Sequence, residues 1–235
     1  MRRTITAAML GILLAACGGA DEAADMDDAA DTAGDMAMDE EAERQIEGGG
    51  ELAGWHGRTD EDAPFDNVLV TDQGNGMYQV DNGPAVVLWQ NGTVAEGNYT
   101  LSGTFNQISS KGHAHGTGIV FGGSDMDGAG QAYTYFMVRG SGDYLVKTRT
   151  GDETFWAGGT DGWVAHEAIA LEDPNGVNSN VLSVQVMANE IAFMVNGTEV
   201  LRAPREGIYA DGFYGVRMNH NLTIQFSGLT MSGGM

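Results

Sequence analysis

From residue 77 to residue 231 the chain alternates apolar and polar positions, or runs solidly apolar, in segments of strand length. Glycine-rich breaks such as Asp81-Asn82-Gly83 and Gly140-Ser141-Gly142 separate these segments. No long stretch follows the 3.6-residue period of an amphipathic helix. The pattern predicts strands over Met77–Val80, Ala85–Trp89, Tyr99–Ile108, Thr117–Gly122, Ala132–Arg139, Asp143–Thr150, Val181–Met187, Ile191–Val195, Glu199–Arg202, Phe213–Met218 and Leu222–Met231.

The clearest turn signal is Asn196-Gly197, which stands between two alternating segments. Asn-Gly suits a type I′ turn, because both of its central residues take positive φ. Many short strands with regular turn signals are typical of a sandwich or barrel. We therefore expect an all-β domain, a two-sheet antiparallel β-sandwich of the jelly-roll type.

The chain begins with the layout of an export signal. Arg2 and Arg3 precede an apolar stretch, Ile5–Leu14, that is too short to cross a bilayer. The run Leu14-Ala15-Ala16-Cys17 resembles the lipobox of bacterial lipoproteins. It predicts a signal peptide over residues 1–16 and lipidation of Cys17, with an ordinary cleaved signal or a twin-arginine signal as the alternatives.

Lipidation would account for Cys17, the only cysteine in the chain. Several acyl chains would anchor the protein stably to a membrane, which is then its first expected partner. Gly18 resembles the residue that follows the cysteine in outer-membrane lipoproteins. We expect a bacterial cell-envelope protein, held at the outer membrane, whose domain has an apolar core without disulfides.

The composition of residues 17–50 predicts a disordered acidic tether. The segment contains twelve carboxylates and one basic residue, Arg44, and such a composition buries too little apolar surface to fold. Residues 51–235 form the expected β-sandwich domain, with 21 acidic residues against 8 basic ones and hence a net charge of −13. That balance argues against a nucleic-acid partner, because binding to phosphates needs an excess of Lys and Arg.

Two regions resemble the concanavalin A-like jelly rolls, among them laminin G-like domains and the bacterial 3-keto-disaccharide hydrolase-like family. One is Asn180–Val186 followed by Ile191–Val200, and the other is Gly212–Asn221 with the segment to Met231. Gly118-Ile119-Val120-Phe121 adds a third similarity. The resemblance covers about residues 85–235 and implies the sandwich fold. It leaves the activity open, because this fold hosts lectins, glucanases and structural modules alike.

The candidates for catalysis are His113 and His115. On a strand, residues two apart share a face, so both imidazoles could flank one substrate or bind one metal ion. The alternative is a pair of hydrogen-bonded histidines at a strand end. The Glu-x-Asp-x-x-Glu spacing of retaining glucanases, which places their carboxylates in one cleft, is absent.

A weak metal candidate is Ser124-Asp125-Met126-Asp127-Gly128. Asp125 and Asp127 partly resemble the start of a calcium loop, although the distal ligands of an EF-hand are missing. Calcium is therefore a possible cofactor, and a simple turn is the alternative.

Basic and aromatic residues gather in one part of an otherwise acidic domain. The candidate ligand-binding residues are Tyr133, Tyr135, Arg139, Lys147, Arg149 and Trp156. Lys147 and Arg149 share a strand face, as do Tyr133 and Tyr135. Such a patch suits a sugar that carries carboxylate or sulfate groups, because arginine binds anions bidentately. The alternative is ion pairing with Asp143, Asp152 and Glu153, with the aromatic rings in the core.

We therefore expect an envelope lipoprotein whose jelly roll binds a carbohydrate or other polar ligand without cleaving it. One alternative is an enzyme that hydrolyses glycosides or keto-sugars with His113 and His115. The other is a structural module that docks onto another envelope protein.

Overall fold

The computed structural model describes residues 42–60, 63–110 and 114–233. The expected signal peptide (residues 1–16), the lipidation site Cys17 and most of the expected tether lie outside these residues and stay predictions. No helix in the described ranges is both long and apolar enough to cross a bilayer.

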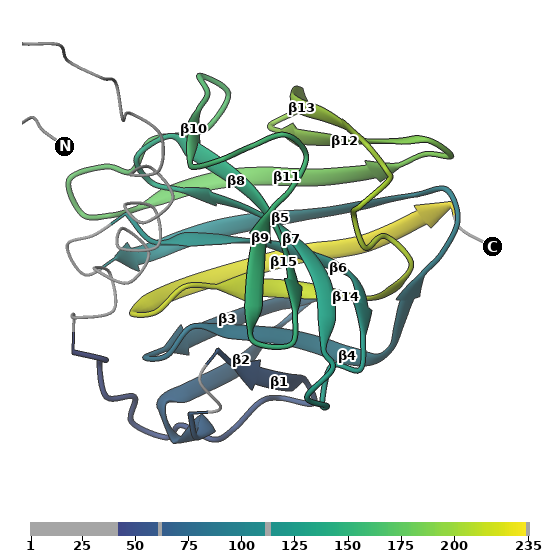
Figure 1. Ribbon diagram of the computed structural model, residues 1–235. Coiled ribbons are helices and arrows are strands. Elements are labelled where there is room, and N and C mark those ends of the chain that lie inside the picture. The colour runs from purple at the N-terminus through teal and green to yellow at the C-terminus, as the bar shows by residue number, and fades with distance from the viewer. Residues whose placement is uncertain (1–41, 61–62, 111–113, 234–235) are drawn as a thin grey trace, which may run out of the picture. The chain divides into compact units, whose positions relative to one another are not determined.

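Two antiparallel sheets make up the domain (Figure 1). Sheet A runs in the order β1 (His56–Thr59), β4 (Val86–Ala95), β14 (Gly212–Met218), β6 (Gly116–Ser124), β7 (Ala132–Arg139), β8 (Asp143–Thr150) and β10 (Val164–Ala165), with β9 (Glu153–Trp156) also paired to β8. Sheet B runs in the order β13 (Thr198–Pro204), β12 (Glu190–Val195), β11 (Asn178–Val186), β5 (Tyr99–Ser110), β15 (Leu222–Gly233), β3 (Met77–Asn82) and β2 (Val68–Gly74). A single 3₁₀ turn, η1 (Phe65–Asn67), precedes β2 in the described chain.

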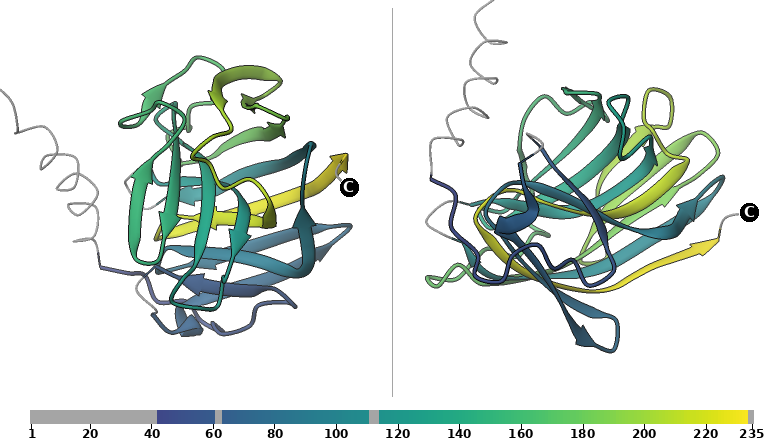
Figure 2. Two further views of the ribbon diagram at one scale, coloured as in Figure 1. Left: turned by 45° about the vertical axis from the view of Figure 1, so that its right-hand side comes forward. Right: turned by 90° about the horizontal axis from the view of Figure 1, so that it is seen from below.

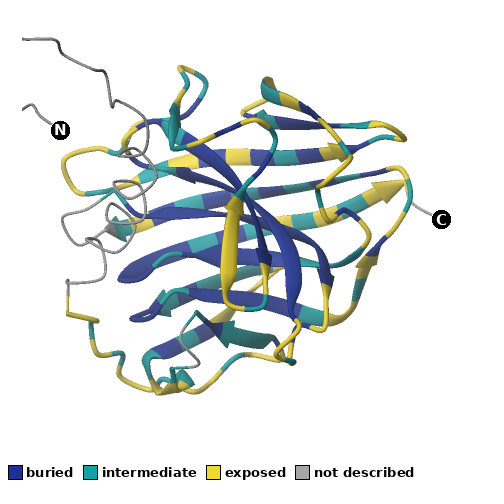
Figure 3. Cartoon of the chain, in the orientation of Figure 1, coloured by how far each residue is buried: buried dark blue, intermediate teal, exposed yellow. Residues whose placement is uncertain are grey.

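The main core lies between the sheets, which Figure 2 shows as stacked layers. Its largest fully buried side chains are phenylalanines from both sheets, and the rings of Phe136 and Phe193 lie 5.2 Å apart. Burial of each such ring contributes about 1.5–3 kcal/mol. Figure 3 shows most strand residues buried, while β9 and many loops are exposed. The expected all-β sandwich is therefore confirmed.

All eleven predicted strands correspond to strands of the structure. Ten of them lie within three residues of the expected bounds, whereas β4 continues six residues beyond the expected end at Trp89. The hairpin between β12 and β13 is also confirmed. Val195 pairs with Thr198, and Asn196 and Gly197 take φ angles of 51° and 81°. Both values are those that a type I′ turn requires. The strands β1, β2, β9 and β10 were not predicted.

The last residues of the expected tether contact sheet B. Arg44 donates from its backbone N–H to Asn221 Oδ1 (2.7 Å) and from Nη2 to the carbonyl of Leu222 (2.5 Å). Its guanidinium also lies 3.3 Å from the carboxylate of Asp81. Gly50 then donates to the carbonyl of Val68 (2.9 Å). Residues 42–50 thus run along sheet B, because one basic residue in the acidic segment finds carbonyl and carboxylate acceptors there.

Candidate functional site

One side of sheet A faces the core, and we call the other side the outward face of sheet A. Side chains alternate along each strand, and the register of the pairs shows which of them share this face. Its described residues include His56 and Arg58 (β1), Val87 and Trp89 (β4), Arg217 (β14), Val120 (β6), Tyr133, Tyr135, Met137 and Arg139 (β7), Leu145, Lys147 and Arg149 (β8) and Trp156 (β9).

The six predicted ligand-binding residues all belong to this face. In the register of the sheet, Tyr133 pairs with Arg149 and Tyr135 with Lys147. Trp156 then pairs with Lys147 across β9. Strand β7 is apolar on both sides, because alternate residues enter either the main core or a second apolar cluster on the outward face. Tyr133, Tyr135, Lys147 and Arg149 are consequently buried, which a freely exposed binding surface would not show.

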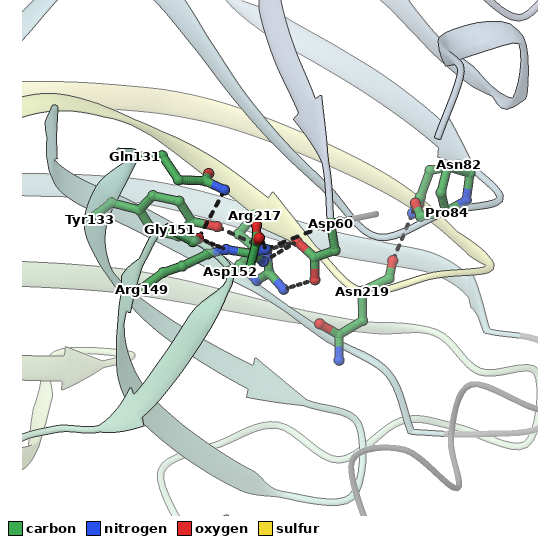
Figure 4. Close-up of polar contacts among 10 residues, drawn as sticks. All are labelled: Asp60, Asn82, Pro84, Gln131, Tyr133, Arg149, Gly151, Asp152, Arg217 and Asn219. Carbon is green, nitrogen blue, oxygen red and sulfur yellow. Dashed lines mark hydrogen bonds and ion pairs between the residues drawn. The ribbon is translucent and has the colours of Figure 1, made fainter. Parts of the chain in front are cut away.

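The centre of the outward face holds one carboxylate between two guanidinium groups (Figure 4). Arg217 donates to both oxygens of Asp60, from Nη1 to Oδ1 (2.7 Å) and from Nη2 to Oδ2 (2.5 Å). Arg149 Nη1 donates to Oδ1 as well (3.1 Å), and Arg149 Nη2 donates to the Asp60 carbonyl (3.3 Å). The Tyr133 hydroxyl lies 3.5 Å from Arg217 Nη1. We call Asp60, Arg149 and Arg217 the arginine clamp.

A glycine stands opposite Arg217, because the backbone of β7 approaches β6 closely at that position. Arg217 pairs with Gly118 on the neighbouring strand β6, where a Cβ would lie 2.0 Å from the carbonyl oxygen of Phe136. The guanidinium carbon of Arg217 lies 4.7 Å from the ring centroid of Tyr135. Such a cation–π contact stabilises a desolvated arginine.

Burial and the neighbouring charges shift the pKa values of Asp60, Arg217 and Tyr133. Burial alone would raise the pKa of the Asp60 carboxyl, but the charges of Arg217, Arg149 and Arg58 outweigh it and lower the pKa from its ordinary 3.8. The pKa of Arg217 lies well above its usual value, because Asp60 more than offsets the cost of burial. Burial also raises the pKa of the Tyr133 hydroxyl. At neutral pH Asp60 and Arg217 are therefore ionised, and Tyr133 keeps its proton.

The lowered pKa of Asp60 predicts a loss of stability in acid. Because the unfolded chain takes up this proton at a higher pH than the folded chain, the contribution of Asp60 is complete above about pH 5 and falls as the pH drops through about 4 and below. Urea unfolding at a series of pH values would measure it. We expect the wild type to lose free energy of unfolding more steeply than Asp60→Asn. Parallel pH curves for the two proteins would contradict a lowered pKa.

Two further cations of the face lie over tryptophan rings. Lys147 Nζ is 4.0 Å from the ring centroid of Trp156, and the guanidinium carbon of Arg139 is 4.3 Å from that of Trp163. Arg139 also donates to Asp143 (3.1 Å). Trp156 and Trp163 stay partly exposed, so each presents indole surface to the solvent beside a positive charge.

Some of the ion pairs that were the alternative to ligand binding are also present. Arg139 pairs with Asp143, and Arg149 lies 3.9 Å from Asp152. The cations of the patch are thus partly paired with carboxylates of the same face.

Sequence reasoning missed two members of the site. Arg217 alternates with the core residues Val216 and Met218, so the period of two could have placed it outward. Trp163, which stands in the link between β9 and β10, was expected beside the patch because it follows Trp156 closely in the sequence. Asp60 follows β1, a strand that the pattern did not predict.

The two catalytic candidates do not form a described pair. His113 lies outside the described residues, so its role stays a prediction. His115 is buried, and its ring centroid lies 4.3 Å from that of His220. A side chain that is buried in this way packs against its neighbours and is not accessible to a polymeric substrate.

Asp125 and Asp127 stand in the loop after β6. Asp125 accepts from the N–H of Gly130 (3.0 Å) and takes a positive φ of 48°, while Asp127 is exposed. No group of three or more His, Cys, Asp or Glu residues suited to a metal ion occurs within the described ranges. The predicted calcium site stays untested, and the geometry of Asp125 is that of a hydrogen-bonded turn.

No protein-family model and no curated protein sequence matches the chain. Among solved structures, the carbohydrate-binding module CBM66 from Bacillus subtilis superposes with a TM-score of 0.56 at 13% identity, covering 78% of this chain and 98% of the module. A Bacillus subtilis protein of unknown function with a galectin-like fold gives a TM-score of 0.51 at 9% identity, covering 77% of this chain and 89% of that one. The domain therefore has a lectin-like jelly-roll fold.

Proposed function

We propose that this protein binds an acidic carbohydrate on the outward face of sheet A and does not cleave it. The observation that carries this proposal is the gathering of cations on that face. Arg58, Arg139, Lys147, Arg149 and Arg217 are five of the eight basic residues between positions 51 and 235. They share one face of a domain whose net charge is −13.

The ligand that fits this charge distribution is short. A long polyanion would be repelled by the acidic remainder of the domain, whereas a terminal acidic sugar would meet mainly the positive face. Arginine suits the carboxylate or sulfate of such a sugar, because its fork of donors matches planar anions. The clamp itself, in which Arg217 holds both oxygens of Asp60, shows how a guanidinium on this face can bind a carboxylate.

Trp156 and Trp163 supply the second element of recognition. Both are partly exposed on the side of the face formed by β8, β9 and β10. Indole rings offer rigid apolar surface at a low cost in conformational entropy, and the C–H faces of a sugar ring can pack against it. Lys147 and Arg139, which lie over these rings, place positive charge beside the packed sugar.

The described carboxylates of this face support binding without cleavage. Glycoside hydrolysis needs one carboxyl that stays protonated as a general acid, which requires a raised pKa. The pKa of Asp60 is lowered instead, and both of its oxygens accept from Arg217. Asp143 accepts from Arg139 and from the hydroxyl of Ser141. Each of these carboxylates is therefore suited to holding a cation.

Calorimetric titration with matched oligosaccharides tests the proposal. We expect trigalacturonic acid or a chondroitin sulfate tetrasaccharide to bind at least about tenfold more tightly than its methyl-esterified or desulfated counterpart, one charge-assisted contact being worth about 1.5–3 kcal/mol. Reducing-end assays on the same samples should show no cleavage. Failure of both acidic ligands, or equal affinity for the methyl-esterified and desulfated forms, would contradict it.

We further propose that the protein works at the bacterial cell envelope, anchored through Cys17. The lipobox-like run at residues 14–17 supports this location. A hydrolase that uses His113 and His115 is a weaker candidate, because His115 is buried. Mass spectrometry of the purified membrane form, showing acylated or unmodified Cys17, distinguishes an anchored from a freely secreted protein.

A further inference from the structure

A second cavity lies away from the outward face of sheet A. It opens between the two sheets and has a volume of about 360 Å³. Its walls come from β3 and β15 of sheet B, from β4 and β14 of sheet A, and from Trp55 just before β1. Pockets of about 300 Å³ and more are of the size that small-molecule ligands occupy.

The register of both sheets breaks at this cavity. On sheet A, Phe213 pairs with Val94 and Gly215 with Trp89, so Tyr214 alone stands opposite residues 90–93. On sheet B, the pairing of β15 with β5 shifts between Ser227 and Thr230. Residues at both breaks line the cavity. Both irregularities thus lie in the walls of the cavity, and bulges often occur beside binding sites.

Aromatic rings dominate the walls. Trp55 meets the rings of Tyr78 and Phe226 edge to face, with centroids 5.2 Å apart in both cases. Tyr214 forms another wall, and burial raises the pKa of its hydroxyl, so it is uncharged at neutral pH. The described lining contains no charged residue, and Gln90 and Thr93 are among its polar members. This wall favours an uncharged ligand with an apolar body.

One donor in the wall lacks an acceptor. Trp55 is 7% exposed, and its indole N–H has no hydrogen-bond partner in the described structure. A buried donor without an acceptor costs about 1–3 kcal/mol. Because the nitrogen is itself covered, only a ligand group that penetrates between the rings would reach it.

We infer that this cavity is a second binding site, for an uncharged bicyclic molecule that places a carbonyl oxygen against the indole N–H of Trp55. Its volume supports that size, because an apolar cavity of about 150 Å³ already holds one benzene ring. The inference is independent of carbohydrate binding, since its walls share no residue with the arginine clamp or with Trp156 and Trp163.

Two probes of nearly equal shape test this site in the full chain. 1-Indanone carries the carbonyl, and indane lacks it. In ¹H–¹⁵N spectra the four tryptophans give four indole signals, and we expect 1-indanone to shift that of Trp55 saturably. In Trp55→Phe, which keeps a ring but loses the donor, the affinity ratio of 1-indanone to indane should fall about three- to tenfold.

A matched control and a second readout keep the test decisive. Tyr144→Phe removes another buried aromatic donor, from a hydrogen bond to Val200 at the β8–β13 side of the sandwich, and should keep the wild-type ratio. If Trp55→Phe fails to fold, contacts between 1-indanone and the protons of Tyr78 and Phe226 decide the matter in the wild type. An unmoved Trp55 signal up to the solubility limit, an unchanged ratio or the lack of those contacts would overturn the inference.

Discussion

Arg217→Leu should lower the free energy of unfolding by about 3 kcal/mol at neutral pH, because it removes the buried partner of both Asp60 oxygens and leaves this partly buried carboxylate with Arg149. Arg217 is 5% exposed and donates to both oxygens of Asp60. Urea unfolding measures the loss. Adding Asp60→Asn to Arg217→Leu should cost less than the sum of the single changes, with a coupling of about 1–3 kcal/mol.

The control for this prediction is the same substitution at Arg202. Its guanidinium also makes close ion pairs, at 2.5 Å to Glu190 and 2.5 Å to Glu199, but the side chain is 41% exposed. Solvent screens such pairs, so Arg202→Leu should change stability little. If the two substitutions lowered the free energy of unfolding equally, burial of the arginine clamp would not explain its contribution to stability.

Trp156→Ala and Trp163→Ala should each weaken acidic-oligosaccharide binding by about thirtyfold, the effect of losing a tryptophan at the centre of a binding surface. Each substitution removes indole surface together with the ring under a cation. Calorimetric titration with trigalacturonic acid measures the change. Trp156→Phe, which keeps an aromatic face, should retain most of the affinity.

Phe155→Ala is the matched control, because Phe155 neighbours Trp156 on β9 and is 51% exposed, yet alternation points it to the other side of the strand. We expect its affinity to stay near the wild-type value. A comparable loss in Phe155→Ala would place the ligand on the wrong side of β9 for the proposed site.

The fold was predictable where strands are long and apolar. Runs such as Ala132–Arg139 mark both their existence and their ends, because glycine turns flank them. The missed strands give weaker signals. Strand β1 reads His-Gly-Arg-Thr without an aliphatic residue, and β10 has only two residues. Such edge strands form because the neighbouring strand offers backbone partners, a tertiary effect that no local pattern records.

The candidate site was predictable in part for the same reason. Tyr133, Tyr135, Lys147 and Arg149 lie on two adjacent strands joined by a short turn, so period two and hairpin pairing bring them together. Asp60 pairs with arginines 89 and 157 positions away. Contacts at such separations depend on the strand order of sheet A, which the sequence pattern does not specify.

The most direct test of the central claim is a map of backbone and indole NMR shifts on titration with trigalacturonic acid and, separately, with a chondroitin sulfate tetrasaccharide. We predict shifts on the strands of sheet A that carry the basic residues, β1, β7, β8 and β14, on β9, and on the indole signals of Trp156 and Trp163, with sheet B unchanged. Shifts centred on sheet B, or no saturable shift with either acid, would contradict binding on the outward face of sheet A.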